Sequence, residues 1–588
     1  MKSKIILTGL VLLLTVSLLP SLSGCTKKTT TTTQSTITQS TTSVTTSNAN
    51  APVYGGMLTC MTDWGNTDPA GFDADLSPAV WSTSVWDAPF LSWLLGGDID
   101  TYGPRGTDAF AFQSAEYIPP QYLGGNDLVT SWSIAMNPIV ITLKLRTGVT
   151  WAANSTIGMA SRAFTSADVV YSLTRGFAAP IVGGTYSFVT SVTAPDTNTV
   201  NINCNTFNAN WAYYIGYGYM PGMITYPESG NSTAGAGGED WRNQSSDGPF
   251  IISNYVSGSS VTYTSNPNYW GQTTISGKSY KLPFVSTLVY PIIPDPSSLI
   301  AALETGKVDW NPSQPLSDSA ELKKGNSALI QQNFLTGNAE VLKLNRLDNQ
   351  YLQNESVRRA LMMATDLNTI NNLTWPGSTE PGFPIAQGNP AYTSISQLPA
   401  STAQLFTYNA TAAKQAITAA GYPSGFSLAI TIQNSSTTDP DIAQLLVSEW
   451  AQVGVTLTIN AIDATAKQTL DNSRKFDCIM ESFSCNNPIV PLSQVEAQAG
   501  VVNLDVYLAS ENFKTQYDKM VLDTDTATLT ADEKALGLAI LDDAGFIPFG
   551  DQVGLNVYQP WIKNYYNETD TGYHNRVPME AELWIAPH

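Results

Sequence analysis

DGPFIISNYVSGSSVTYTSNPNYWG, residues 247–271, carries the strongest structural signal in this chain. Two apolar runs, Pro249 to Tyr255 and Val261 to Tyr263, flank a turn of serine and glycine, and this pattern predicts a β-hairpin. The second run ends in Asn-Pro-Asn-Tyr-Trp-Gly, a turn that carries two large aromatic rings. Ordinary secreted proteins also contain such hairpins, so the neighbouring stretches have to decide what this one means.

Several other stretches, in a set order along the chain, share a resemblance with this hairpin. They are IVITLKLRTGVTW at residues 139–151, FTSADVVYSL at residues 164–173 and ALETGKVD at residues 302–309. Together they resemble the family 5 extracellular solute-binding proteins, which are the oligopeptide, dipeptide and nickel-type receptors of ATP-driven importers. The resemblance runs from Tyr54 to Trp584, and it departs where AANSTIGMASRA, residues 152–163, replaces the family's tight turn.

The resemblance implies an α/β protein with the two-lobed periplasmic-binding-protein-like fold of type II and an extra α+β domain inserted in the first lobe. The predicted boundaries are residues 51–294 for the first lobe, with the inserted domain at about 75–215, then 295–540 for the second lobe, and 541–588 for a return to the first. The length agrees, because a single core stops growing near roughly 250 to 300 residues and this chain has 588. We place the hinge between Tyr290 and Asp295.

Local patterns also favour an α/β architecture. Asp295 can cap a helix, Pro296 suits its first position, and Gly306 suits its end. Further along, residues 426–432 and 455–459 alternate like strands on either side of a stretch with helical spacing, residues 441–453. This order predicts a βαβ unit with two parallel strands and a right-handed crossover. Capped helices are predicted at residues 354–366 and 409–421.

The N-terminus has the pattern of an export signal. Two lysines precede an apolar run from Ile5 to Leu19, and Leu-Ser-Gly-Cys follows at residues 22–25. The run is too short for a membrane-spanning helix, which needs roughly 20 apolar residues. Its ending resembles a lipoprotein signal, in which residues 1–24 are removed and Cys25 becomes the lipid-bearing N-terminus. A plain secretory signal with a chance cysteine is the alternative.

The segment after Cys25 should tether the folded body to the membrane. Residues 26–50 are almost wholly Thr, Ser, Gln and Asn, and they contain too little apolar surface to offset the entropy of ordering them. We therefore expect a flexible segment between the lipid and the first strand, near Tyr54.

Charge and composition exclude several classes of function. The formal net charge of −20 argues against nucleic-acid or anionic-membrane surfaces, which require basic patches. The only histidines, His574 and His588, lie in the tail, so a nucleophile would lack its usual base. We therefore predict no catalytic residues, no cofactor and no metal site.

The cysteines leave their pairing open. Cys60, Cys204, Cys478 and Cys485 contain no C-x-x-C motif, which argues against a metal site. In an exported protein these four permit three disulfide pairings, of which Cys478 with Cys485 is the local one.

Candidate ligand-binding residues have two origins. In the family the loop after the first strand lies at the mouth of the cleft, so the resemblance points to Asp63 and Trp64. Aromatic rings offer stacking surfaces, and asparagine amides offer neutral donors and acceptors. The remaining candidates of these two kinds are Trp270, Asn345, Trp375, Phe483, Asn486 and Asn487. Each aromatic ring could equally well lie in the core.

Residues 485–487 bear on specificity. In peptide receptors of the family, an aspartate near this point holds the amino terminus of the ligand. Here the nearest matches are Cys485, Asn486 and Asn487, and none of them is charged. Because a buried unpaired charge is costly, we favour an oligopeptide held mainly through its backbone, or an oligosaccharide, over a zwitterionic dipeptide or a bare metal ion.

The resemblance also implies a function. A monomer, lipid-anchored at the outer face of the cytoplasmic membrane, captures a small solute between its lobes and delivers it to two permease and two ATPase subunits without doing chemistry. An exported hydrolase and a surface sensor that is not coupled to transport are the alternatives.

Overall fold

The computed structural model describes residues 51–63, 65–73, 80–113, 117–124, 127–179, 184–218, 222–230, 237–496 and 511–588. Residues 52–588 form one unit, which contains every helix and strand of the described chain. The predicted signal, Cys25, the tether and Trp64 lie outside the described residues. Every helix within the described ranges is too short or too polar to span a membrane.

The predicted hairpin belongs to a four-stranded sheet of the first lobe. β8 (Phe250–Val256) pairs antiparallel with β9 (Ser260–Ser265), so the prediction is confirmed. β9 in turn pairs with β12 (Thr287–Pro291), and β12 lies parallel to β1 (Met57–Thr59). β12 thus lies between the hairpin and β1, the first strand of the folded body. The buried side chains of this sheet belong to one large apolar core.

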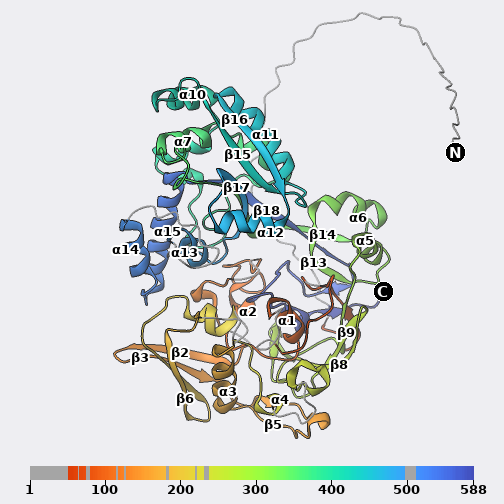
Figure 1. The fold of residues 1–588 in the computed structure, drawn as a ribbon. Helices are drawn as coiled ribbons and strands as arrows, with labels where there is room; N and C mark the ends of the chain where they lie inside the picture. The colour runs from red at the N-terminus through yellow and green to blue at the C-terminus, as the bar shows by residue number, and fades with distance from the viewer. Residues whose placement is uncertain are drawn as a thin grey trace, which may run out of the picture. The chain divides into compact units, whose positions relative to one another are not determined.

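A second four-stranded sheet lies within the range predicted for the inserted domain. It has the order β2 (Val129–Met136), β3 (Ile139–Leu145), β7 (Thr199–Cys204) and β6 (Val189–Asp196), and all of its pairings are antiparallel. In Figure 1 these strands lie at the end of the unit opposite α10 (Ala410–Ala419) and α11 (Asp439–Gln452).

Helix α3 (Ser166–Phe177) packs against β6 and β7 of this sheet. Its start follows the predicted capping pattern, because the carboxylate of Asp168 accepts a hydrogen bond of 2.9 Å from the backbone N–H of Thr165. Arg162 binds the other carboxylate oxygen of Asp168 at 2.7 Å. The insert at residues 152–163, which contains Arg162, therefore helps to fix this helix.

The largest sheet carries the second lobe. Its order is β13 (Trp310–Pro315), β18 (Phe546–Tyr558), β14 (Ile330–Leu344), β17 (Cys478–Ser484), β15 (Phe426–Gln433) and β16 (Val455–Ile462). β15 and β16 pair in parallel, with α11 (Asp439–Gln452) connecting them, which confirms the predicted βαβ unit. A second apolar core, which includes the fully buried Trp450, forms under these helices and strands.

The predicted helix caps are also present. The carboxylate of Asp295 accepts from the backbone N–H of Ser298 at 2.7 Å, and Asn354 and Asn409 cap α7 and α10 in the same way. Gly306 ends the first of these helices with φ of +70°, a conformation that favours glycine.

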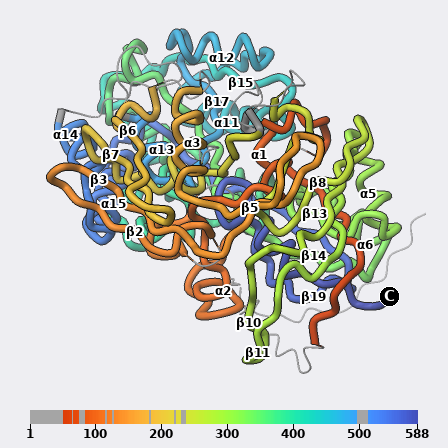
Figure 2. Tube along the Cα trace, turned by 90° about the horizontal axis from the view of Figure 1, so that it is seen from below, coloured from red at the N-terminus to blue at the C-terminus, as the bar shows by residue number. Residues whose placement is uncertain are grey.

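The remaining described elements are short or lie at the surface of the sheets. The helices are α1 (Val80–Asp87), α2 (Ile99–Tyr102), α4 (Pro227–Gly230), α5 (Pro296–Glu304), α6 (Ser319–Gly325), α7 (Glu355–Met363), α8 (Leu367–Thr374), α9 (Ala400–Ala403), α10 (Ala410–Ala419), α12 (Ala464–Asn472), α13 (Ile489–Glu496), α14 (Glu511–Met520), α15 (Thr526–Asp543) and α16 (Val577–Glu582). The two-stranded pairs are β4 (Thr150–Trp151) with β5 (Arg162–Ala163), β10 (Gln272–Ile275) with β11 (Lys278–Lys281), and β19 (Ile562–Lys563) with β20 (Trp584–Ile585). Figure 2 shows β10 and β11 beside α2, where the Thr273 hydroxyl lies 3.3 Å from the Asp100 carboxylate.

Two long strands, β14 and β18, connect the lobes. Their neighbour β13 is tied to β1 of the first lobe through Asp309, which directly precedes β13. The backbone N–H of Asp309 donates to the carbonyl of Thr59, and its carboxylate accepts the N–H of Thr59, both at 2.8 Å. The backbones of Trp310 and Cys60 also form an isolated parallel β-bridge. These contacts favour a crossing on β14 and β18, while the boundary at residue 295 and the hinge near Tyr290 stay predictions.

The cysteines that the structure describes are all free thiols, so the pairing of Cys478 with Cys485 is wrong. Cys478 begins β17, and Cys485 directly follows its last residue. An extended strand rises about 3.3 Å per residue, whereas the Cα atoms of a disulfide lie at most about 7 Å apart. Burial raises the pKa of the Cys478 thiol well above its usual value, which keeps the thiol protonated.

A buried ion pair in the second lobe gives a test of this packing. Lys343 on β14 is fully buried, and its Nζ lies 2.6 Å from Asp471 Oδ1 on α12. Asp471→Asn removes the charged partner from a buried ammonium group, so we expect the lobe to lose about 3 kcal/mol of stability. Urea denaturation followed by tryptophan fluorescence measures this loss.

Asp348→Asn is the matched control. Asp348 and Arg474 form an exposed pair at 3.8 Å, so its loss should change the stability by less than about 0.5 kcal/mol. Equal losses of stability in the two variants would contradict the prediction that the buried ion pair contributes more to stability than the exposed pair.

Candidate functional site

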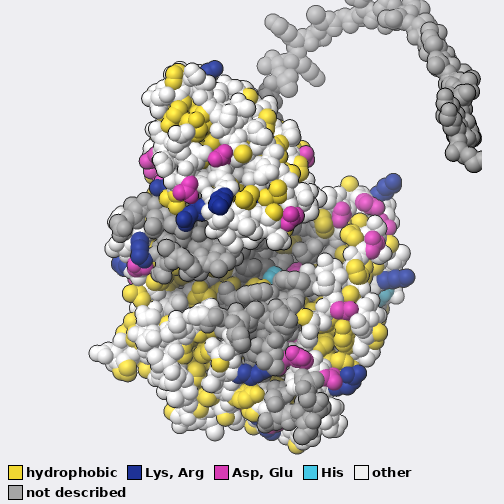
Figure 3. All heavy atoms as spheres, viewed as in Figure 1, with side chains coloured by type: hydrophobic (Ala, Val, Ile, Leu, Met, Phe, Trp, Pro, Cys, Tyr) yellow, Lys and Arg dark blue, Asp and Glu magenta, His cyan; other side chains and the backbone are white. Residues whose placement is uncertain are grey.

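Figure 3 shows side chains of the part that holds α10 and α11 and of the part that holds β2 and β3. Basic and acidic side chains are scattered over both parts and form no continuous basic patch among the coloured side chains. Two clusters of candidate residues, one from each lobe, are built by strand ends and by the C-terminal segment.

Asp63 belongs to the first-lobe cluster and is held by two side chains from the C-terminal segment. His574 Nδ1 lies 2.5 Å from its carboxylate, and Arg576 Nη2 lies 2.6 Å from both carboxylate oxygens. Burial raises the pKa of Asp63, but Arg576 and His574 together outweigh burial and hold that pKa well below its usual range. Asp63 is therefore an ionised group whose charge is already compensated.

Asp570 completes this cluster. It is fully buried, and the cation beside it is Arg576, whose Nε lies 3.8 Å from Oδ1. Burial raises the pKa of Asp570 to about 7, because one distant guanidinium shared with Asp63 does not replace the lost hydration.

The first-lobe cluster has the residue types of a metal site. One ligand atom from each of Asp63, Asp570 and His574 lies within 4.8 Å of the others. Arg576, however, donates to both oxygens of Asp63, so its positive charge lies where a metal ion would have to bind. The arrangement is an ion-pair network that joins the start of the folded chain to its C-terminal segment.

Two aromatic candidates have defined surroundings. Trp270 follows the hairpin, as predicted, and the guanidinium of Arg146 lies 4.2 Å from the centre of its ring. This cation–π contact covers one face of the indole. Trp375, at the end of α8, is 8% exposed and packs in the second-lobe core.

Phe483, Asn486 and Asn487 form the second-lobe cluster at the end of β17. The Phe483 ring lies 5.1 Å from that of Phe383 and is 6% exposed. Asn486 donates its amide N–H to the carbonyl of Thr336 at 3.0 Å. Asn487 accepts from the N–H of Ile489 at 3.2 Å, while its buried Nδ2 has no hydrogen-bond partner among the described residues. Asn487 therefore keeps an unused donor.

Asn345 lies elsewhere in the same lobe. Its amide donates to the carbonyls of Arg474 at 2.9 Å and Phe476 at 2.8 Å, and its oxygen accepts from the N–H of Asp348 at 3.1 Å. These bonds brace the loop before β17, so Asn345 is not brought together with Asn486 and Asn487.

Asp551 on β18 is a member of the second-lobe cluster that the sequence did not reveal. Its carboxylate accepts from the N–H of Gly337 at 3.0 Å, and the carbonyl of Gly337 accepts from the N–H of Cys485. Gly337 has φ of +70°, and a Cβ at this position would collide with Asn486 Oδ1. The close approach of the three strands therefore requires glycine.

Burial raises the pKa of Asp551 to about 8. An acid thus lies beside Asn486 and Asn487. The resemblance implies an aspartate near the position of these asparagines in peptide receptors of the family. Asp551 comes from a strand more than sixty residues further along the chain, so only the pairing of β14 with β17 and β18 reveals it.

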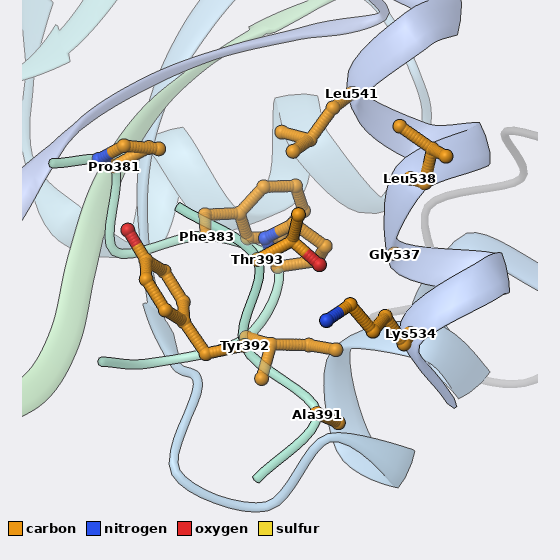
Figure 4. A pocket seen from close by; sticks show the side chains of 11 residues that line it. Pro381, Phe383, Ala391, Tyr392, Thr393, Lys534, Gly537, Leu538 and Leu541 are labelled. Carbon is orange, nitrogen blue, oxygen red and sulfur yellow. The ribbon is translucent and has the colours of Figure 1, made fainter. Parts of the chain in front are cut away.

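A small hollow in the second lobe is too small for a solute. Figure 4 shows Lys534, Gly537, Leu538 and Leu541 of α15 on one side and a loop with Phe383 and Tyr392 on the other. Its volume is about 10 Å³, which is room for about one water molecule.

Comparisons with known proteins agree with this architecture. Residues 125–496, well over half of the chain, match the family described as bacterial extracellular solute-binding proteins, family 5 middle. The chain belongs to this family of binding proteins, and its fold is the mixed α/β, type II periplasmic-binding-protein fold.

Two curated relatives match part of the chain. Heme-binding protein A of Haemophilus influenzae is 26% identical over 351 residues, which cover 56% of this chain and 60% of the relative. The dipeptide-binding protein of Escherichia coli is 24% identical over 365 residues, which cover 59% of this chain and 63% of the relative. The matches thus span less than two thirds of each relative.

Solved structures match nearly the whole described fold. HbpA2 from Haemophilus parasuis has a TM-score of 0.73 at 20% identity, over 90% of this chain and 100% of that structure. DppA from Helicobacter pylori, in complex with the peptide STSA, has a TM-score of 0.63 at 18% identity, over 91% and 99%. The predicted fold class is confirmed by these likenesses.

Buried acids predict how stability depends on pH. In addition to Asp551 and Asp570, burial raises the pKa of several carboxyls to about 7 or 8. They are Asp127, Asp247, Glu340, Glu449, Glu533 and Glu582. Between about pH 4 and pH 8 the folded protein therefore binds more protons at these groups than the unfolded chain, so its stability falls as the pH rises.

We expect a higher melting temperature at pH 5 than at pH 8, by about 5 °C or more, in differential scanning calorimetry. Asp551→Asn keeps an oxygen for the Gly337 N–H and imitates the neutral acid, so it should make the pH dependence shallower. A melting temperature that is equal or higher at pH 8 would contradict the assignment of neutral acids to the core.

Proposed function

We propose that this protein captures a peptide-like solute outside the cytoplasmic membrane and delivers it to the permease and ATPase subunits of an ATP-driven importer. The observation that carries the proposal is membership of the family 5 solute-binding proteins over residues 125–496. Structures of the same fold include complexes with a bound peptide, as in DppA from Helicobacter pylori and AppA from Bacillus subtilis. The protein acts as a monomer and does no chemistry.

The second-lobe cluster favours a ligand held through neutral groups. Asn487 offers an unused amide N–H, which suits a peptide carbonyl or a sugar hydroxyl. Asp551 lies near the asparagines, but its raised pKa keeps it mostly neutral at pH 7, so it offers a free ammonium group little charge. We therefore propose an oligopeptide held mainly through its backbone, and an oligosaccharide is the alternative.

Closure of the lobes on this ligand would bend β14 and β18. The register between these strands is interrupted between Leu335 and Val341, around Gly337. A bulge of this kind bends a strand more easily than a regular ladder does. A bend here, together with the hinge predicted between Tyr290 and Asp295, would bring Asn487 and the rest of the second-lobe cluster toward the first lobe.

The ligand class can be tested with peptides that differ only at their amino terminus. Native mass spectrometry of freshly purified protein first identifies any retained solute. We then expect a free peptide and its N-acetylated form to bind within about threefold of each other, because no ionised acid of the second-lobe cluster faces the amino group. A retained free dipeptide, or a tenfold preference for the free amino terminus in calorimetry, would contradict this proposal.

Asn487→Asp supplies the matched variant. The aspartate is isosteric and can still accept from the Ile489 N–H, but it adds a charge at the unused donor. The variant should prefer the free amino terminus by about tenfold, since a charge-assisted hydrogen bond replaces a neutral one.

The proposed location depends on Cys25. We propose that Cys25 carries lipid and that residues 26–50 form the tether. Cys25→Ser should release the protein from the membrane fraction into the soluble fraction, because a lipid chain supplies the membrane affinity. Membrane association equal to that of the parent protein would make the anchor assignment wrong.

A further inference from the structure

A second hollow lies where the inserted sheet of the first lobe meets the helices of the second. Its volume is about 70 Å³, which is several times that of the hollow in Figure 4. Its lining residues come from β2, from the segment after β7 and from the junction of α14 and α15. They are Pro120, Leu123, Trp132, Ile134, Phe207, Ala209, Trp211, Ala212, Asp523, Thr524, Thr526 and Leu529. We call it the aromatic hollow.

Three aromatic rings form much of its wall. Trp132 and Trp211 meet edge to face, with ring centres 6.2 Å apart, and Phe207 lies in the same wall. Trp211 is 5% exposed and Phe207 is 4% exposed, so these rings are held by packing. Aromatic faces attract a cation through their quadrupole, most strongly when the cation is partly desolvated.

An acid completes the lining. Asp523 stands just after α14, and its buried Oδ2 has no hydrogen-bond partner among the described residues. Burial raises the pKa of Asp523, the charge of Asp532 and a side-chain hydrogen bond with Asp532 raise it further, and Lys519 lowers it. Lys519 itself lies 2.7 Å from Asp532, and Asp525 caps α15 by accepting from the Thr528 N–H.

The charges around the hollow therefore do not balance. In the described part of the chain, the cation beside Asp523, Asp525 and Asp532 is Lys519, and its ammonium group is bound to Asp532. An unpartnered carboxylate oxygen beside aromatic faces suits a group that carries both positive charge and carbon. An anion would be repelled, and a purely apolar group would leave the oxygen unsatisfied.

We propose that the aromatic hollow is a subsite for an organic cation, namely the alkylammonium or alkylguanidinium head of a basic side chain in the captured peptide. This inference rests on the proposed function for the identity of the natural ligand. Asp523 supplies the charge, and Trp132 and Trp211 enclose the carbon-bearing head.

The position of the hollow couples this subsite to the contact between the lobes. Beside it, the N–H of Ala209 donates to the carbonyl of Val521 at 2.7 Å. A cation in the hollow touches the inserted sheet on one side and Asp523 on the other. Its binding therefore stabilises the arrangement in which these surfaces meet.

A small probe tests the subsite without a peptide. The purified full chain is titrated with n-butylammonium chloride and with 1-butanol, its neutral analogue, at low salt, and binding is followed by tryptophan fluorescence and calorimetry. We expect saturable binding of the amine at least tenfold tighter than that of the alcohol, and weaker binding in 0.5 M NaCl. Equal binding of the two probes would overturn the proposal.

Substitutions test which side chains of the aromatic hollow bind the amine. Asp523→Asn should weaken amine binding about tenfold and leave alcohol binding unchanged, while Trp211→Phe should weaken it about threefold. Asp518→Asn is the control, because Asp518 lies on α14 in an exposed pair with Lys514. Its variant should bind the amine like the parent, and an unchanged affinity in Asp523→Asn would overturn the assignment.

A peptide pair links the subsite to the proposed function. Ala-Ala-Lys-Ala and the same peptide with norleucine in place of lysine differ only in the charged head. The parent should prefer the lysine peptide by about tenfold, and Asp523→Asn should lose this preference. If neither peptide binds while the amine still does, peptide capture fails and the subsite stands. If both peptides bind equally and the amine does not bind, the subsite fails and peptide capture stands.

Discussion

The pairing of β14 with β18 joins the two lobes and sets the position of most of the groups discussed above. The first residues of β14 meet the last residues of β18 next to β13, which is tied to the first strand of the chain. Further along, the same two strands run into the sheet that carries the second lobe. The register of their ladder shifts between Leu335 and Val341, around Gly337. The polar groups of the second-lobe cluster gather at this shift in register because unpaired backbone groups there need partners.

Only 13% of the residues of this chain are charged, yet several of its ion pairs are buried. Arg105 binds Glu568 and Glu582, and Arg576 binds Asp63, so both arginines tie the C-terminal segment to earlier parts of the first lobe. Other buried acids avoid the cost of burial by keeping their protons. A core built in this way suits mildly acidic surroundings better than alkaline ones.

In the proposed function, the two asparagines at the end of β17 and Asp551 supply the polar groups of the second lobe that meet the ligand. A family aspartate would place a permanent charge there, whereas this chain offers amides and an acid that burial keeps neutral. A neutral site of this kind discriminates by hydrogen-bond geometry more than by charge. The aromatic hollow, by contrast, offers an acid with one oxygen that has no hydrogen-bond partner among the described residues. The two sites would bind different parts of one ligand: the second-lobe cluster its backbone, and the aromatic hollow one of its side chains.

Local elements and their order could be predicted from the amino-acid sequence. The hairpin at residues 250–265, the capped helices and the βαβ unit at residues 426–462 all depend on side-chain spacing within a few turns or strands, so periodicity was sufficient to predict them. The order of such elements was also sufficient to recognise the fold class. Asp63 and Asn487 were chosen as binding candidates from the resemblance and from side-chain chemistry, and their role in binding stays a prediction. The contacts between distant residues came only with the tertiary structure: Asp63 meets His574 and Arg576 from the other end of the chain, and Asp551 reaches Gly337 only through the register of β14 with β18. The local cysteine pair failed for a different reason: Cys478 and Cys485 are close in sequence, but they lie at the two ends of the extended strand β17. Local spacing sets φ, ψ and the face of an element, whereas contacts between elements depend on strand pairing and packing, for which a single sequence contains no periodic signal.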